Sequence, residues 1–156
     1  MKKTDVTNST VDFKTVNQTL IDLLANVVWV EEGALKRGPF SALTVKDVHT
    51  IYAISMYEEK TASQLAKAVH LSPSAMTTAI DRLVEKGYVE RRRSKTDRRV
   101  VRLGLTHQGR VLYRAHQAFH LQMTKAMFNG FTDNAAAILE KALGNLQAYL
   151  QDILKE

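Results

Sequence analysis

The sequence predicts a mainly α-helical domain that carries one small β-hairpin, in the α+β class. Apolar residues recur three and four positions apart in several long segments, which is the spacing of amphipathic helices. Over 88–105 apolar and polar residues alternate instead, as in a half-buried hairpin. The 156 residues, 45% hydrophobic and 24% charged, suit one globular domain rather than a disordered or fibrous chain.

The first helix is expected over 11–32, where one apolar stripe includes Leu20 and Val27. Glycine disfavours helix interiors and proline stops helices. Gly33, Gly38 and Pro39 are therefore expected to break this helix.

Two shorter helices are predicted from their first residues. Thr44 with Asp47, and Thr61 with Gln64, have the spacing of a capping box, in which each side chain bonds the other residue's backbone. The second of these helices is expected to end at about Val69. The segment 44–69 therefore predicts two helices in succession.

A fourth helix is predicted from Ser72 to Lys86. Ser72 is a favourable N-cap, and Pro73 suits the first helical position because its missing N–H would be unpaired there. Gly87 stands where a left-handed residue closes a helix. The third and fourth helices, joined by a short turn, form a helix-turn-helix.

A β-hairpin is predicted directly after the helix-turn-helix, with strands at 88–93 and 99–105 and a turn at 94–97. Thr106 is expected to cap a fifth helix that reaches about Phe128, and a sixth follows Thr132. This order is that of a winged helix-turn-helix flanked by long terminal helices. The domain boundaries predicted are 11–156 for the whole domain, 44–105 for the winged-helix lobe, and 11–33 and 106–154 for the long flanking helices.

The positive charge of the chain is concentrated in the hairpin. The sequence holds 22 Lys and Arg against 16 Asp and Glu, a net charge of +6. Between Arg91 and Arg102 there are seven cations and one acid, so the rest of the chain is neutral. A charge run is often only a solvated surface, but a basic hairpin beside a helix-turn-helix favours nucleic acid as the partner.

The exposed side of the fourth helix is predicted to enter the major groove. Ser74, Ala75, Thr78 and Arg82 lie opposite the core-facing Ile80 on a helical wheel, and small hydroxyl side chains allow close approach to bases. The alternative is an ordinary polar surface. The predicted DNA contacts are Ser63, Ser72, Ser74, Thr77, Thr78, Arg82, Arg91, Arg93, Lys95, Asp97, Arg98 and Arg99.

Two features of these predictions leave alternatives open. Arg98 and Arg99 at the hairpin tip are expected to reach the minor groove, with Asp97 either orienting an arginine or serving as a plain turn acid. The terminal helices are expected to form a two-fold dimer that sets two recognition helices about one DNA turn apart. The alternative is that these helices pack only within one chain.

Several function classes are disfavoured. The chain has no cysteine, which excludes disulfides, thiol nucleophiles and thiolate zinc sites. It has no GxSxG, phosphate-loop or HExxH motif, so no enzyme activity, catalytic residue or required cofactor is expected. No apolar run is long enough to span a membrane, and residues 1–10 resemble a polar, disordered tail rather than an export signal. A cytoplasmic protein is expected.

The combined motifs resemble the MarR family of transcription regulators over residues 12 to about 154. This resemblance implies a dimeric winged-helix protein that binds palindromic, double-stranded operator DNA, with Arg99 at the position of the family's wing-tip arginine and Asp97 at that of the acid that orients it. A non-specific architectural DNA protein is the competing interpretation. The resemblance rests on Ser63-Gln64-Leu65-Ala66, Leu71-Ser72-Pro73-Ser74, the run from Leu83 to Arg91, Ser94 to Arg99, Leu103-Gly104-Leu105-Thr106 and Gly109-Arg110.

Within that family the sequence is most similar to the fatty-acid-biosynthesis repressors of Gram-positive bacteria, the FabT-type branch. This similarity implies repression of fatty acid synthesis genes, with long-chain acyl-acyl carrier protein as a corepressor that tightens DNA binding. It rests on Glu31-Glu32, His49-Thr50-Ile51, Met76-Thr77-Thr78, Lys86-Gly87-Tyr88, Arg98-Arg99-Val100-Val101, Arg114-Ala115-His116 and Phe119-His120.

The resemblance to the MarR family also implies an effector pocket between the dimerisation helices and the winged-helix lobe. Its candidate residues are Trp29, Val30, His49, Tyr52, Tyr57, Tyr113, His116 and Phe119, although such aromatic side chains are commonly plain core. No metal is expected, but His49, His116 and His120, with Glu31 or Glu32, supply ligands for an alternative zinc site. Phenolic compounds are the other alternative effector.

Overall fold

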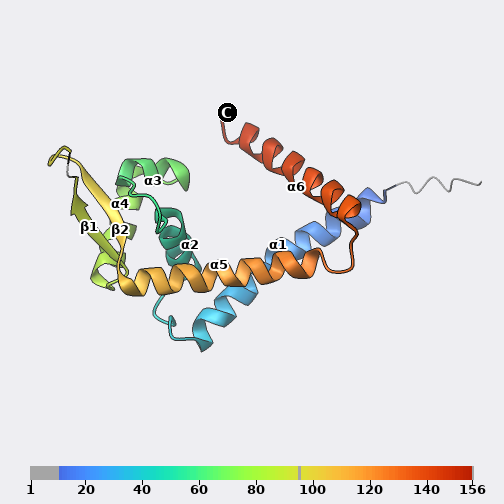
Figure 1. Ribbon diagram of the computed structural model, residues 1–156, viewed down its shortest axis with the longest axis horizontal. Coiled ribbons are helices and arrows are strands. Elements are labelled where there is room, and N and C mark those ends of the chain that lie inside the picture. Colours follow the sequence, from blue (N-terminus) through green and yellow to red (C-terminus); the bar gives the residue numbers. More distant parts are fainter. Residues whose placement is uncertain (1–10, 95, 156) are drawn as a thin grey trace, which may run out of the picture. The chain divides into compact units, whose positions relative to one another are not determined.

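The computed structural model describes residues 11–94 and 96–155 (Figure 1). The chain forms two compact units, with the division between Tyr113 and Arg114, and each is described by itself. The tail predicted at residues 1–10, and Lys95 among the predicted DNA contacts, lie outside the described residues.

The first unit contains the winged helix. It consists of α1 (Phe13–Arg37), α2 (Val45–Ile54), α3 (Ala62–Ala68), α4 (Pro73–Glu85), β1 (Val89–Arg93), β2 (Val101–Leu105) and the beginning of α5 (His107–Met127). The strands are antiparallel, with Val89 opposite Leu105 and Arg93 opposite Val101. The second unit holds the rest of α5 and α6 (Asp133–Ile153). The predicted class, helical with one hairpin, is confirmed.

Helix α1 is longer than predicted. It passes through Gly33 without a break and ends at Arg37, so the predicted interruption at Gly33 is wrong. A glycine inside a helix costs only about 1 kcal/mol, which neighbouring turns offset. The positive charges of Lys36 and Arg37 in the last turn interact favourably with the negative end of the helix dipole. The N–H of Gly38 donates to the Leu35 carbonyl at 3.2 Å and closes the helix.

Both predicted capping boxes are confirmed. The Asp47 N–H donates to Thr44 Oγ1 at 3.2 Å, and the Thr44 N–H donates to Asp47 Oδ2 at 3.0 Å. The corresponding distances for Gln64 and Thr61 are 3.2 Å and 2.9 Å. Local hydrogen bonds therefore define where α2 and α3 begin.

The ends of α4 are also as predicted. Ser72 Oγ accepts the Ala75 N–H at 3.2 Å, Pro73 occupies the first turn, and Gly87 has a φ of +80°. The helix is therefore fixed at both ends by residues adjacent to it in the sequence.

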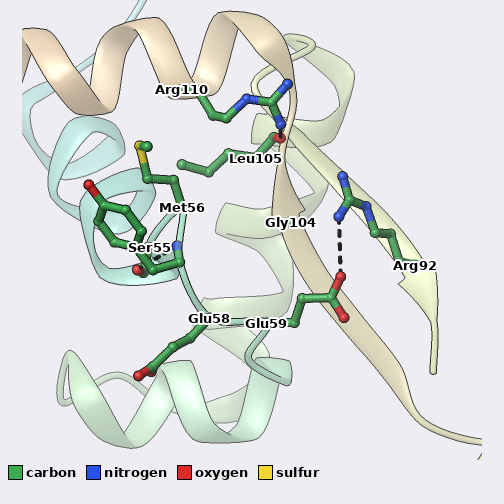
Figure 2. Close-up of a pocket in the computed structure, with 9 residues that line it drawn as sticks. Ser55, Met56, Glu58, Glu59, Arg92, Gly104, Leu105 and Arg110 are labelled. Carbon is green, nitrogen blue, oxygen red and sulfur yellow. Dashed lines mark hydrogen bonds and ion pairs between the residues drawn. The ribbon is translucent and has the colours of Figure 1, made fainter. Parts of the chain in front are cut away.

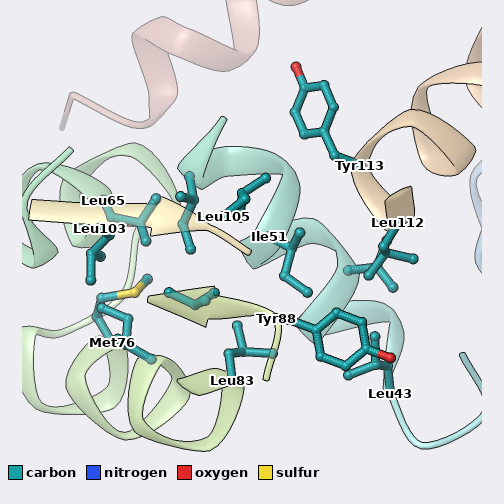
Figure 3. Packing of buried hydrophobic residues seen from close by; sticks show 14 of the residues in the cluster. Leu43, Ile51, Leu65, Met76, Leu83, Tyr88, Leu103, Leu105, Leu112 and Tyr113 are labelled. Atoms are coloured by element: carbon teal, nitrogen blue, oxygen red, sulfur yellow. The ribbon is translucent and has the colours of Figure 1, made fainter. Parts of the chain in front are cut away.

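The core of the first unit joins α4 to the wing (Figure 3). Met76, Ile80 and Leu83 of α4 are buried as the helical wheel predicts, and Val84 packs at the edge. The other large buried side chains come from α2, α3, both strands, α5 and the segments just before α2 and β1, namely Leu43, Val48, Ile51, Ile54, Leu65, Tyr88, Val89, Leu103, Leu105, Leu112 and Tyr113. This packing orients the opposite side of α4 outward.

No helix in the described part of the chain meets the length and apolarity required to cross a membrane.

Replacing His70 by glycine is expected to stabilise the protein. His70 lies in the turn between α3 and α4 with a φ of +53°, a conformation that costs side chains other than glycine about 1–2 kcal/mol. After the greater unfolded-state entropy of glycine is subtracted, His70→Gly should add about 0.5–1 kcal/mol to the free energy of unfolding. Urea denaturation measures this gain. His107→Gly, in the first turn of α5, is the control and should lose stability; equal losses in both variants would contradict the prediction.

Candidate nucleic-acid interface

The exposed face of α4 consists of small, hydroxyl-bearing side chains in its N-terminal half. Ser74, Ala75, Thr77 and Thr78 are all exposed. The Thr77 hydroxyl donates to the Pro73 carbonyl at 2.9 Å, and the Thr78 hydroxyl donates to the Ser74 carbonyl at 3.1 Å. Because their hydrogens are used within the helix, these oxygens are available as acceptors, the role that amino groups of adenine and cytosine require.

The two remaining predicted serines differ in their roles. Ser63 is exposed on α3. Ser72 is exposed too, but its hydroxyl already caps α4 and lies 3.2 Å from Ser74 Oγ. Ser72 therefore has a structural role, and Ser63 keeps its predicted DNA contact as an expectation.

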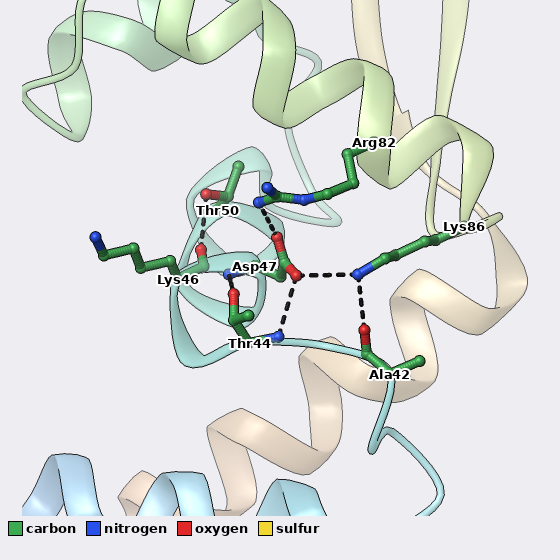
Figure 4. A network of polar contacts seen from close by, with 7 residues as sticks. All are labelled: Ala42, Thr44, Lys46, Asp47, Thr50, Arg82 and Lys86. Carbon is green, nitrogen blue, oxygen red and sulfur yellow. Dashed lines mark hydrogen bonds and ion pairs between the residues drawn. The ribbon is translucent and has the colours of Figure 1, made fainter.

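Arg82 bonds within the protein through its guanidinium group. Its Nη2 donates to the Asp47 carboxylate of α2 (Figure 4). Lys86 reaches the same carboxylate at 3.3 Å and also donates to the Ala42 carbonyl at 2.7 Å. The sequence predicts Arg82 as a DNA contact, but the structure places it on Asp47. Sequence reasoning missed Asp47 here because its capping box already explained its presence.

Asp47 is charged although it is buried, with only 1% of its side chain exposed. Burial opposes its ionisation, but the Thr44 N–H, the Arg82 guanidinium and the Lys86 ammonium outweigh burial and lower its pKa. A lowered folded-state pKa means that this stabilisation is present at neutral pH and is lost as the pH falls through that pKa.

The cations at the base of the wing bond to neighbouring parts of the protein. Arg91 pairs with Asp81 of α4 at 2.5 Å. Arg92 pairs with Glu90 and, at 3.2 Å, with Glu59, and hydrogen bonds to both carboxylates raise its pKa. Arg102 donates to the Glu59 carbonyl at 3.0 Å. These side chains anchor the hairpin to the loop after α2 and to α4.

The cations at the wing tip are exposed. Arg93, Arg98 and Arg99 have no ion pair with any residue that the structure describes. The Asp97 carboxylate accepts the backbone N–H of Arg99 at 2.9 Å, and the Asp97 carbonyl accepts the Val100 N–H at 3.0 Å. The sequence predicts that Asp97 either orients an arginine or is a plain turn acid. In the described residues its carboxylate holds the backbone of the turn and no guanidinium group, so it acts as a turn acid.

Two cavities of the first unit are lined mostly by residues other than the predicted effector residues. A cavity of about 220 Å³ lies between the loop after α2, the wing and the start of α5 (Figure 2). Arg92 and Glu59 form an ion pair at its edge, and Arg110 donates to the Leu105 carbonyl at 2.9 Å. A second cavity, of about 240 Å³, lies between α1 and the start of α2. Tyr57 lines the first cavity, and none of the other seven predicted effector residues lines either one.

The aromatic candidates in the first unit have separate environments. Trp29 is 79% exposed on α1. Tyr52 stacks on Tyr113 with ring centroids 4.8 Å apart, and Tyr57 meets Tyr113 edge-on at 6.1 Å. Burial, followed by the neighbouring Tyr52, raises the pKa of Tyr113. Tyr113 is buried and belongs to the core, whereas Tyr52 and Tyr57, which contact its ring, are 40% and 71% exposed.

The candidate zinc ligands occur as two pairs. In the first unit His49 Nε2 lies 3.2 Å from Glu31 Oε2. In the second unit the His116 and His120 rings have centroids 4.4 Å apart, and the Phe119 ring lies 5.4 Å from that of His120. The zinc site stays a prediction.

A helix-turn-helix followed by a two-stranded wing with an exposed basic tip defines a DNA-binding winged helix. The family model for MarR matches residues 43–101, which span α2 to the start of β2. The chain is 30% identical over 115 residues to the uncharacterized HTH-type transcriptional regulator YpoP of Bacillus subtilis, covering 72% of this chain and 74% of YpoP. It therefore belongs to the MarR family of transcriptional regulators, which are not enzymes.

Other relatives match parts of the chain or its whole fold. YsmB of Bacillus subtilis, another uncharacterized HTH-type regulator, is 35% identical over 94 residues; the match spans 59% of this chain and 64% of YsmB. The structure is similar to that of Streptococcus pneumoniae FabT in complex with DNA, with a TM-score of 0.83 and 36% identity, covering 91% of this chain and 99% of FabT. The regulator SlyA, with 13% identity and a TM-score of 0.69, shares the fold.

Proposed function

We propose that this protein is a homodimeric repressor that binds palindromic operator DNA in the cytoplasm. The observation that carries this proposal is the pairing, in one unit, of the small hydroxyl face of α4 with the exposed arginines of the wing tip. The helix face has the chemistry of base readout in a major groove, and the tip has the charge that a phosphate backbone or a narrow minor groove attracts. The likeness to FabT, whose structure was solved with DNA, supports the same interface.

Exposed apolar side chains on the terminal helices support the dimer. On α1, Phe13, Leu24 and Trp29 are exposed, and α6 exposes Ile138 and Tyr149. No residue of α6 is buried in the single chain. Such apolar surfaces mark protein contacts, and a second copy of the chain is the partner that a palindromic site requires. Sedimentation equilibrium should give twice the chain mass of 17.6 kDa.

The genes that we propose as targets are those of fatty acid biosynthesis, with long-chain acyl-acyl carrier protein as corepressor. The 36% identity to FabT over nearly its whole length supports this proposal. Long-chain acyl-acyl carrier protein, a product of the pathway, would then strengthen repression of its own synthesis. It does so if it binds the DNA-bound repressor more tightly than the free repressor.

DNA selection followed by titration tests the function. Duplexes are selected from a random library with the wild-type protein, and their affinity is compared with that of shuffled duplexes. A preference of at least about 10³-fold for selected DNA is expected of a specific repressor. Equal affinity for both would contradict the repressor and favour an architectural DNA protein.

The effector is tested on the selected duplex. Long-chain acyl-acyl carrier protein should raise the affinity, whereas the unacylated carrier should leave it unchanged. If the two carriers act alike, the fatty acid proposal fails. The histidine pairs favour zinc as a second candidate effector, and a change in affinity on chelation or on zinc addition would identify it. Phenolic acids complete the panel.

A further inference from the structure

One buried carboxylate bonds to two cations at the C-terminal end of α4. Asp47 of α2 is 1% exposed, and both of its oxygens are used: Oδ1 accepts from Arg82, and Oδ2 lies 3.3 Å from Lys86 and 3.0 Å from the Thr44 N–H (Figure 4). Arg82 belongs to α4 and Lys86 caps its C-terminus. The C-terminal half of α4 is thus tied to the first turn of α2.

The two cations remain near solvent. The Arg82 side chain is 47% exposed and that of Lys86 is 29% exposed, although their charged groups bond to Asp47. Both follow, along α4, the exposed hydroxyl face of Ser74 and Thr78. Without Asp47, long basic side chains at this position would be available to any phosphate backbone.

We propose that Asp47 is a positioning residue that sets the DNA specificity of this protein by acting through Arg82 and Lys86. It holds the two cations on the protein, so that α4 meets DNA with its hydroxyl face rather than with charge. The same bonds fix the orientation of α4 relative to α2. This inference rests on the proposed function, since it concerns how α4 discriminates one duplex from another.

Release of the two cations should change the affinity for the selected duplex and for unrelated duplexes by different amounts. Each contact to a phosphate steepens the dependence of log affinity on log salt by about 0.9 and is independent of sequence. Cations released from Asp47 would therefore strengthen binding to every duplex. The selected duplex would gain less, because its base contacts depend on the orientation of α4 that the release loosens.

Asp47→Asn is the test variant. The amide oxygen of asparagine still accepts the Thr44 N–H, so the cap of α2 is preserved while the charge is removed. On shuffled duplex at 50 mM salt, the affinity should rise roughly 3- to 10-fold, and the salt slope should steepen by about 0.9 to 1.8. The ratio of selected to shuffled affinity should fall. Thermal unfolding of the same samples reports the folded state.

Two further variants separate positioning from general charge and from stability. Asp152→Asn makes the same change in net charge on the exposed end of α6, and it should leave the salt slope unaltered. The triple variant D47N/R82Q/K86Q should return the slope to the wild-type value, because it removes the released cations. A purely structural role would lower only the unfolding temperature.

The outcomes are distinct. An unchanged slope and specificity ratio in folded D47N would overturn the inference, as would a steeper slope that persists in the triple variant. If D47N does not fold, the K86Q variant tests the inference instead. Its dependence of log affinity on log salt should equal that of wild type if Asp47 holds Lys86 away from DNA. A slope smaller by about 0.9 would show that Lys86 contacts phosphate and would overturn the inference. If the wild-type protein itself shows no preference for selected DNA, the proposed function fails instead.

Discussion

Arg99→Ala is expected to weaken binding to the selected duplex by about 1–3 kcal/mol, the range for one good groove contact. Arg99 lies at the wing tip, is exposed, and forms no ion pair with the described residues. Its backbone is held by Asp97 at 2.9 Å, so the wild-type arginine is presented from an ordered turn. Because its side chain makes no contact with the core, the free energy of unfolding should stay within about 0.5 kcal/mol of wild type.

Fluorescence anisotropy with labelled duplex measures this loss, and urea denaturation checks the fold. Arg114→Ala, an exposed arginine of α5 outside the wing, removes the same charge and serves as the control. If Arg99→Ala binds like the control, the wing tip does not contact DNA.

Helix ends could be predicted from the sequence wherever residues close together in the chain determine them. The capping boxes at Thr44 and Thr61 and the closing glycine at Gly87 act over three or four residues, so their spacing alone located the helix ends. Gly33 failed as a break because a single unfavourable residue is outweighed by the turns on either side of it. Helix ends that depend on cooperativity are harder to place than ends that depend on caps.

The charges of the site required the fold. The segment from Arg91 to Arg102 holds the whole net charge in the sequence, yet Asp81 and Glu59, which lie outside it, pair with Arg91 and Arg92. Among the described arginines of this segment, Arg102 bonds only to the Glu59 backbone carbonyl, and Arg93, Arg98 and Arg99 are left without a carboxylate partner. The Arg82 pairing has the same origin, because its partner Asp47 is 35 residues away along the chain. No local spacing reports such a contact.

Gly109 is a position where one added methyl group should be severely destabilising. It lies in the first turn of α5, where a Cβ atom would stand 2.1 Å from the Tyr88 carbonyl oxygen and 3.3 Å from Leu105 Cβ. The same carbonyl accepts the Thr106 N–H at 3.1 Å. Because the obstacle is backbone at the start of the wing, it cannot rotate away as a side chain would.

Gly109→Ala should therefore lower the free energy of unfolding by about 3 kcal/mol, at the upper end of overpacking effects, and lower the melting temperature by roughly 6–12 °C. Gly33→Ala is the matched control, because its Cβ would meet only the flexible end of Arg37 at 3.3 Å. Within α1 that substitution should stabilise by about 0.5–1 kcal/mol. Thermal and urea unfolding should therefore show a lower free energy of unfolding for Gly109→Ala and a higher one for Gly33→Ala. A Gly109→Ala protein as stable as wild type would show that α5 does not pack against the Tyr88 backbone this closely.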